Sequence, residues 1–415
     1  MAFHTHTLPN GLTLIGETIP TALSASFGFY VRTGSRDEIG AENGVSHFLE
    51  HMMFKGTARR TALEVNLDFD RIGADYNAST SEETTCYFAT VLPEYLPTAI
   101  DILADIMRPS LREQDFDTEK QVILEEIKMY EDSPASMVWD RAKTHYFGDH
   151  PLGQSILGPS AGIAALSRGQ MQDYFSRRYA PNNVVAVVCG AVDWDAVVAC
   201  VEKQCGHWSG PTAARSDVRD HRPTPGVHLI PHAAATQENV LMLSRGAAAE
   251  SPLRYAGALL ATAVGDDSGS RIYWELVDPG LVENAGCMVD RAEGTGLFVA
   301  TLTGDPEATG KNLKHLQRIF DEVQRDGITE DELTQAKNKV MSRIVRANER
   351  PKGRLHSLAG AWLYNREQGQ ADTEIARFDA VTTTDIRSYL DEYPIDKLTI
   401  TAYGPLTTLV IDTLP

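Results

Sequence analysis

The sequence contains an internal repeat, which restricts the folds that the chain can adopt. A segment from Tyr179 to Gly190 ends the first half of the chain, and a similar segment from Tyr393 to Gly404 ends the second. Both pairs of end residues are 214 positions apart, and each segment runs from a tyrosine through an apolar stretch to a glycine. Self-similarity of this kind indicates a duplicated structural unit. Because 415 residues exceed what one ordinary core accommodates, we expect two similar domains.

The stretch between the two repeats has the composition of a linker. Residues 209–226 are rich in proline, serine, glycine and charge, without apolar periodicity. We therefore expect an N-terminal domain over 1–212, a linker over 213–226 and a C-terminal domain over 227–415. Strands followed by pairs of helices, without strict βαβ repetition, favour an α+β fold. The prediction is two homologous α/β-sandwich domains with largely antiparallel sheets.

Apolar residues recur at three- and four-residue spacing in several segments, which predicts amphipathic helices. These helices are expected at 44–54, 95–107, 117–131, 167–179, 311–325 and 330–348. Strands are expected near 12–15, 25–31, 76–77, 84–91, 227–230 and 239–243.

Two histidines and a glutamate lie on one face of the helix expected at 44–54. Residues i, i+3 and i+4 of a helix are neighbours on its surface, which applies to His47, Glu50 and His51. Two imidazoles one turn apart can bind one zinc ion, which lowers the pKa of its bound water to about 7. Glu50 would then act as general base while this water attacks a peptide carbonyl. A bare match of five residues also occurs by chance, but the apolar neighbours predict a buried helix, where unpaired polar groups are costly.

A third zinc ligand must come from another segment, because catalytic zinc sites usually have three protein ligands and a water. The helix expected at 117–131 carries Glu119 and Glu126, which are seven residues apart and share a face, whereas Glu125 points elsewhere. We expect Glu126 to be the third ligand and Glu119 to support catalysis by orienting a ligand imidazole. From helix geometry alone, Glu125, Glu119 or an aspartate is nearly as admissible.

The order His-x-x-Glu-His, with Glu126 after 74 intervening residues and Glu119 seven positions before it, resembles the pitrilysin/insulinase family, which includes the mitochondrial processing peptidases. Similar stretches are 8–12, 51–57, 72–80 and 156–163. The resemblance implies two similar domains, one zinc ion per chain bound by the first, and cleavage of short or unfolded peptides. It also implies that substrate adds as a strand near Asn77 and Ala78.

The second half lacks the zinc motif. The counterpart of the zinc helix is expected at 256–265, where alanine and leucine replace the metal-binding residues, so this domain should form the opposing wall of a chamber. Many active relatives have an arginine and a tyrosine in this half that bind substrate, but the matching positions hold Val277 and Glu283. Possible substitutes are Arg271, Tyr273 and Arg291, although packing and surface roles are more typical of such residues.

The loss of the arginine–tyrosine pair bears on the partners of the chain. The resemblance implies a dimer, and a heterodimer whose homologous partner supplies the pair would explain the loss. A homodimer with altered contacts to substrate is the alternative. A non-catalytic structural or regulatory subunit of a peptidase-like complex and a simple metal-binding protein are competing functions. The retained Glu50 favours catalysis, because a structural zinc site closes its fourth position with a protein ligand.

Composition excludes other classes. A net charge of −19 argues against a nucleic-acid partner, which requires a basic surface. No apolar run reaches the length of a membrane span, and the N-terminus has no targeting pattern, so we expect a cytoplasmic protein. Five cysteines without framework spacing suit a reducing compartment, and we expect no thiolate ligand on the metal.

Overall fold

The computed structural model describes residues 2–215, 219–223 and 225–409, and its contacts divide the chain into two compact units. The first unit comprises Met1–Lys128, Gln154–Ser216 and Arg346–Gln370, and the second comprises Met129–Gly153, Asp217–Val345 and Ala371–Pro415. Each unit thus includes one segment from the other half of the sequence. The expected division into 1–212 and 227–415 is based on the sequence repeat. It differs from the two units because 129–153 belongs to the second unit and 346–370 to the first. The expected linker includes 216–218 and 224, which lie outside the described residues.

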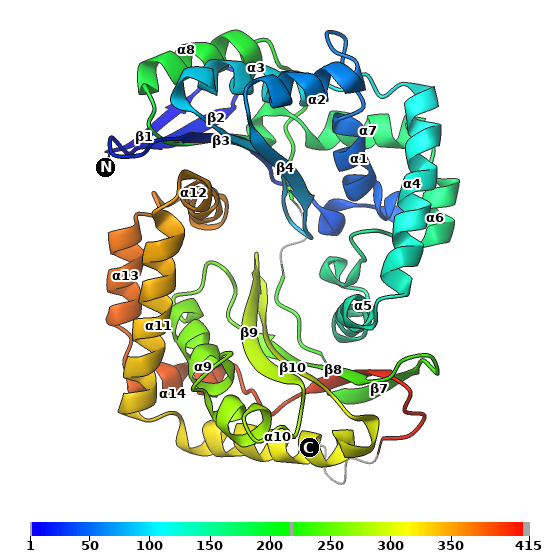
Figure 1. The fold of residues 1–415 in the computed structure, drawn as a ribbon, viewed down its shortest axis with the longest axis vertical. Helices are drawn as coiled ribbons and strands as arrows, with labels where there is room; N and C mark the ends of the chain where they lie inside the picture. Colours follow the sequence, from blue (N-terminus) through cyan, green and yellow to red (C-terminus); the bar gives the residue numbers. More distant parts are fainter. Residues whose placement is uncertain (1, 216–218, 224, 410–415) are drawn as a thin grey trace. The chain divides into compact units, whose positions relative to one another are not determined.

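The first unit contains a six-stranded sheet in the order β1-β2-β6-β3-β5-β4 (Figure 1). Its strands are β1 (Ala2–Thr7), β2 (Thr13–Thr18), β3 (Ala25–Val31), β4 (Asp75–Thr80), β5 (Thr85–Val91) and β6 (Val184–Gly190). β2 runs parallel to β6, and the other neighbouring strands are antiparallel. β4 is an edge strand, because it pairs with β5 on one side only.

Both faces of the first sheet are covered by helices. On β6, Ala186 and Val188 belong to one core and Val185 and Val187 to another, as alternating side chains require. Helices of this unit are α1 (Val45–Met53), α2 (Ala62–Arg71), α3 (Leu96–Ile106), α4 (Glu113–Glu131), α6 (Ser160–Ala165), α7 (Arg168–Arg178), α8 (Trp194–Cys205) and α12 (Pro351–Asn365). In Figure 1, α3 and α8 lie over one face and α12, which comes from the second half of the sequence, over the other.

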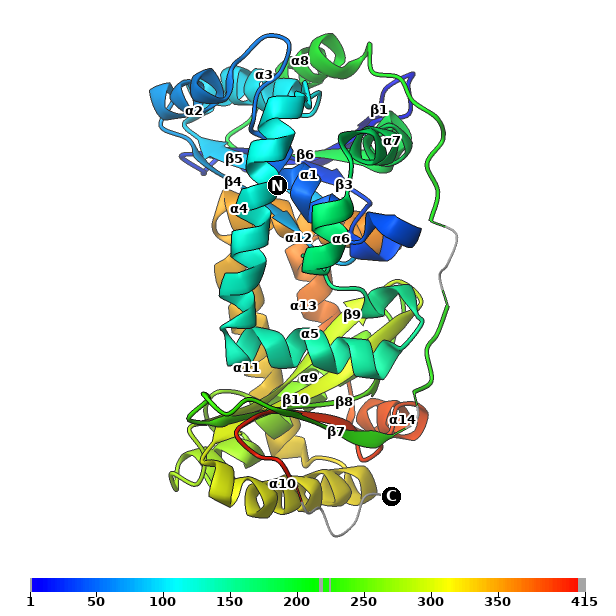
Figure 2. The ribbon, with the colours of Figure 1, turned by 90° about the vertical axis from the view of Figure 1, so that its right-hand side faces the viewer.

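The second unit repeats this plan around a five-stranded sheet in the order β7-β11-β8-β10-β9. Its strands are β7 (Gly226–Pro231), β8 (Glu238–Gly246), β9 (Asn284–Ala292), β10 (Thr295–Gly304) and β11 (Thr399–Gly404). Its helices are α5 (Pro134–Phe147), α9 (Arg254–Gly265), α10 (Pro306–Asp326), α11 (Glu330–Asn348), α13 (Ala371–Asp379) and α14 (Thr383–Glu392). α5, from the first half of the sequence, packs on one face of the sheet, and α10 lies on the other (Figure 2).

These features confirm the expected fold class of two similar α+β units with largely antiparallel sheets. Each expected helix is present with ends shifted by a few residues, and α9 lies at the expected counterpart of the zinc helix. Short 3-10 helices lie at Ser35–Asp37, Gly40–Glu42, Pro93–Tyr95, Pro151–Gly153 and Pro181–Asn183, and a π-helical turn lies at Tyr273–Val277. No helix in the described parts of the chain combines the length and apolar character needed to cross a membrane.

Candidate metal centre

The beginning of α1 is set by a glycine and a buried carboxylate. Gly44 has a φ of 90°, and a Cβ atom there would lie 2.4 Å from the backbone oxygen of Leu157. The backbone N–H groups of Gly44 and Ser46 donate to the two carboxylate oxygens of Glu38, each at 2.8 Å. These two acceptors satisfy backbone N–H groups that the first turn of a helix leaves without an intrahelical partner. Burial raises the pKa of Glu38 to about 8, although these hydrogen bonds lower it.

Gly44→Ala is expected to destabilise the first unit by more than the roughly 1–3 kcal/mol of a strained backbone conformation, because its methyl group also collides with the chain. Thermal unfolding measures the effect. Gly40→Ala is the matched control, because Gly40 also has a positive φ of 59° but nothing lies within 4 Å of its added Cβ. Equal melting temperatures for the two variants would show that the close approach at Gly44 does not matter.

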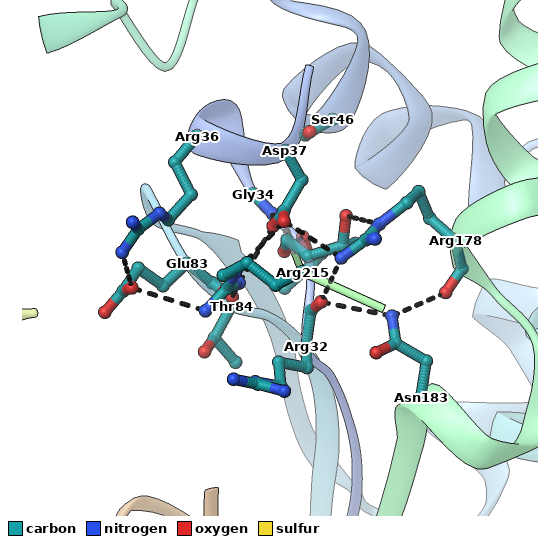
Figure 3. A network of polar contacts seen from close by, with 12 residues as sticks. Arg32, Gly34, Arg36, Asp37, Ser46, Glu83, Thr84, Arg178, Asn183 and Arg215 are labelled. Atoms are coloured by element: carbon teal, nitrogen blue, oxygen red, sulfur yellow. Dashed lines mark hydrogen bonds and ion pairs between the residues drawn. The ribbon is translucent and has the colours of Figure 1, made fainter. Parts of the chain in front are cut away.

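A buried network of charges holds the segment that leads into α1 (Figure 3). The Asp37 carboxylate lies 3.0 Å from Arg178 and 2.8 Å from Arg215. The Glu83 carboxylate, in the turn between β4 and β5, pairs with Arg36 and Arg215. Since each acid contacts two guanidinium groups, the network links the segment before α1 to the turn that follows β4.

Three potential metal ligands converge between α1 and α4. One ligand atom from each of His47, His51 and Glu126 can be chosen so that all lie within 4.8 Å of one another. A Glu126 oxygen is 3.8 Å from His47 Nε2 and 3.6 Å from His51 Nε2. The two helices are joined by the stacked rings of Phe48 and Phe116, whose centroids are 4.8 Å apart. No second group of this kind occurs within the described residues.

His51 is oriented by a chain of charged groups. Its Nδ1 lies 2.9 Å from an oxygen of Glu119, whose other oxygen is 2.6 Å from Lys55 Nζ. Donation from Nδ1 to Glu119 leaves Nε2 with a lone pair on the side of Glu126. Burial lowers the pKa of His51, but the hydrogen bond to Glu119 and the charges of Glu126, Glu119 and Glu50 outweigh it, so the pKa is raised overall.

His47 is buried without a hydrogen bond of its own. Its exposed fraction is 9%, and its Nδ1 has no hydrogen-bond partner among the described residues. Burial and the nearby His51 lower its pKa to about 4, so the ring is neutral at pH 7 and retains a lone pair for a metal. Its Nε2 lies 3.8 Å from Glu126, beyond hydrogen-bonding distance, on the side of the other potential ligands. A metal ion between these groups would give Nε2 the partner that a buried polar atom normally has.

Glu50 lies next to these ligands on α1 and is held by β4. The hydroxyl of Thr80 donates to Glu50 Oε2 at 2.6 Å, and Oε1 forms no hydrogen bond to another described residue. Burial raises the pKa of Glu50, although the Thr80 hydrogen bond and the His51 charge lower it. A carboxylate with a raised pKa and one uncommitted oxygen is suited to accept a proton near neutral pH.

The donor set fits zinc. Zinc is held by imidazole nitrogens and carboxylate oxygens at about 2.0–2.2 Å, and two tetrahedral ligands are then about 3.4 Å apart. The separations of 3.8 and 3.6 Å between Glu126 and the two histidines are close to this value. Two histidines and one glutamate leave a fourth position for water or substrate, which is the pattern of a catalytic rather than a structural site.

The remaining site residues of the sequence analysis have clear locations. Glu125, the alternative ligand, is exposed and pairs with Lys128 at 2.6 Å, so it points away from the histidines. Asn77 and Ala78 lie on the edge strand β4. The N–H of Ala78 donates to the Asn77 side chain at 2.8 Å and is therefore not used in pairing with β5. The edge strand thus has a backbone N–H group, that of Ala78, whose acceptor is a side chain and not a neighbouring strand.

In the second unit, Val277 and Glu283, where the resemblance implies an arginine and a tyrosine, have ordinary contacts. Val277 packs against the core, and the Glu283 side chain accepts a hydrogen bond from Gln237. Arg271, a possible substitute, donates to both carboxylate oxygens of Glu332, at 2.5 and 2.8 Å. Tyr273 contacts Asp278 at 3.5 Å. Arg291 lies on β9 and has an interaction partner.

Sequence reasoning did not identify Glu38, Lys55 and Thr80 as parts of the site. Lys55 and Thr80 lie within stretches that carry the family resemblance, 51–57 and 72–80. Their location in these stretches was the only signal in the sequence, because neither residue stands at a helical or metal-ligand spacing from the His-x-x-Glu-His motif. Glu38 had no such signal.

Glu119→Gln is expected to weaken zinc binding about 10- to 100-fold, because groups that orient a metal-bound histidine have effects of this size. The substitution keeps the shape of the side chain but removes the charge that lies between His51 and Lys55. Competition with a chromogenic chelator measures the affinity. Glu125→Gln is the control on the same helix and should bind zinc as the wild type does; an unchanged affinity in Glu119→Gln would contradict the orienting role.

The chain matches known proteins along most of its length. Residues 14–160 match the family model described as insulinase (peptidase family M16), and residues 165–340 match the peptidase M16 inactive domain. A Streptomyces coelicolor protein named an uncharacterized zinc protease is 34% identical over 409 residues, covering 96% of this chain and 89% of that protein. The mitochondrial-processing peptidase subunit beta of Saccharomyces cerevisiae is 39% identical over 204 residues, covering 49% of this chain and 44% of that protein.

A solved structure has the same fold. The crystal structure of a protease from Helicobacter pylori superposes with a TM-score of 0.88 and covers 97% of this chain and 99% of its own. Its sequence identity is 22%, so this likeness concerns the fold alone.

Proposed function

Because this chain belongs to the insulinase family, peptidase family M16, we propose that it is a zinc-dependent endopeptidase that hydrolyses short or unfolded peptides. The observation that carries the proposal is the convergence of His47, His51 and Glu126 beside the carboxylate of Glu50. Relatives named zinc proteases support the coarser part of the proposal, a zinc-dependent protease.

The proposed mechanism assigns a role to each side chain. His47, His51 and Glu126 would hold one zinc ion, which would supply a lowered pKa for water and polarisation of a carbonyl group. Glu50 accepts a proton from the attacking water at Oε1 and passes it to the leaving amine. Glu119 keeps the His51 ring in the orientation and tautomer that a ligand requires.

The edge strand β4 is proposed to bind the substrate. A peptide added along Asn77 and Ala78 would pair with the open edge of the sheet, and its backbone would replace the Asn77 side chain as acceptor for the Ala78 N–H. Binding of this kind reads the backbone of an extended chain. Peptides that are short or unfolded satisfy that requirement, whereas folded proteins do not.

We also propose that the chain works as a dimer. Val277 and Glu283 stand where active relatives carry an arginine and a tyrosine, so a homologous subunit that supplies this pair would complete the site. A relative named as subunit beta of a processing peptidase supports a heteromeric assembly, and a homodimer is the alternative. Light scattering of the purified chain tests for self-association.

Incubation with an internally quenched, unstructured peptide tests the activity, and mass spectrometry identifies the cleaved bonds. We expect cleavage at internal bonds, none of a stably folded control protein, and loss of activity on zinc removal. Release of single terminal residues would contradict an endopeptidase. The second candidate function is a non-catalytic structural or regulatory subunit, which the absence of the arginine–tyrosine pair also favours. A chain that binds zinc but cleaves nothing, whether tested by itself or with a homologous partner, would support this candidate.

A further inference from the structure

Thr80 connects the proposed base to the strand proposed to bind substrate. Its hydroxyl donates to Glu50 Oε2 at 2.6 Å, which is the short distance expected for a hydrogen bond to a carboxylate. This is the hydrogen bond that orients the Glu50 side chain among the described residues. Oε1 is therefore left to accept a proton.

The position of Thr80 follows from the alternation of β4. Tyr76, Ala78 and Thr80 are half-buried along the strand, whereas Asp75, Asn77 and Ser79 are exposed. Tyr76 and Ala78 pack against the core that contains α1, and Thr80 shares their face. Ala78, on the proposed binding edge, is therefore two residues from the hydroxyl that holds Glu50.

The end of β4 is rigidly held. The Ser81 N–H donates to the Thr84 carbonyl at 2.9 Å and closes a tight turn. Within this turn the Glu83 carboxylate contacts Arg36 and Arg215 (Figure 3) and accepts a hydrogen bond from Tyr364 at 2.8 Å. Contacts from three other segments thus restrain the backbone that carries Thr80.

We propose that Thr80 is a positioning residue, whose hydroxyl fixes Glu50 and ties the orientation of the base to the strand that receives the peptide. The inference rests on the proposed peptidase function. Hydrogen bonds to charged groups contribute on the order of 10- to 100-fold in an equilibrium or rate. Loss of the hydroxyl should therefore affect the chemical step, while the β4 backbone and the zinc ligands remain.

The test compares three variants in the zinc-loaded protein. Thr80→Val removes the hydroxyl but keeps the branched shape, and kcat should fall about 10- to 100-fold with KM within about threefold of wild type. Thr80→Ser restores the hydroxyl and should recover most of kcat. Thr90→Val is the matched control on β5, since Thr90 bonds to Ser26 at 2.7 Å and not to Glu50. Zinc affinity, measured by chelator competition, should be equal in all of them.

Crystal structures of wild type and Thr80→Val separate this inference from the proposed function. We expect Glu50 to leave its observed rotamer in the valine variant, whether or not the wild type cleaves peptides. An unmoved Glu50, or a kcat in Thr80→Val equal to that of Thr90→Val, would overturn the inference. A wild type that binds zinc but cleaves nothing would count against the peptidase function, and the Glu50 rotamer would then decide the positioning role alone.

Discussion

Glu50→Gln is expected to lower kcat by about 10²–10⁴-fold while zinc remains bound, because general base catalysis contributes rate factors of this size. Glutamine keeps the shape of the side chain and can still accept the hydroxyl of Thr80, but it cannot take a proton from water. The proposed zinc ligands His47, His51 and Glu126 are unchanged. Peptide cleavage and zinc content are measured on the same preparation.

The control for this variant is Glu125→Gln, which makes the same chemical change at an exposed position on α4. It should retain the kcat and zinc content of the wild type. If Glu50→Gln cleaves the peptide at the wild-type rate, Glu50 is not the base; if it loses zinc, its effect on kcat does not report on proton transfer.

Arg354→Met is expected to lower the stability of the first unit by about 3–5 kcal/mol, because it leaves a buried carboxylate without its partner. Arg354 on α12 is 2% exposed, and it pairs with Glu17 on β2, which is 4% exposed. It also donates to the carbonyl of Gly369. For a unit of this size, the loss corresponds to a fall in melting temperature of roughly 6–20 °C, measured by circular dichroism.

A double variant distinguishes loss of the ion pair from loss of packing. Replacing a buried ion pair with apolar side chains is often neutral, so Glu17→Leu combined with Arg354→Met should recover most of the melting temperature. A single Arg354→Met variant that melts with the wild type would show that this contact does not fasten α12 to the sheet. Equal losses in the single and double variants would point to packing instead.

Local pattern was sufficient to predict much of the fold. The helix around His47 and the strands at 25–31 and 84–91 have periodicities that tertiary contacts reinforce, and these elements are present. The exchange of α5 and α12 between the units could not be predicted. An apolar helix face shows that a helix is buried, but not against which sheet, because the partners lie far away in the sequence.

Local sequence pattern likewise predicted one part of the candidate site and not the other. Spacing within one helix placed His47, Glu50 and His51 together, and the matches to family M16 confirm the resemblance that pointed to Glu126. Helix geometry alone did not separate Glu126 from Glu125, because the choice depends on how α4 is rotated against α1. Thr80 reaches Glu50 through sheet pairing and tertiary packing, which no local pattern encodes. The zinc ligands, the base and the substrate strand stay predictions.

A zinc titration of the metal-free chain tests whether peptide cleavage depends on one zinc ion at this site; bound metal and cleavage of an unstructured peptide are measured on the same samples. We predict no cleavage without metal, a rise in activity in proportion to bound zinc, and a plateau at one ion per chain that His51→Ala does not reach. Cleavage that persists without metal, or wild-type activity in His51→Ala, would contradict it.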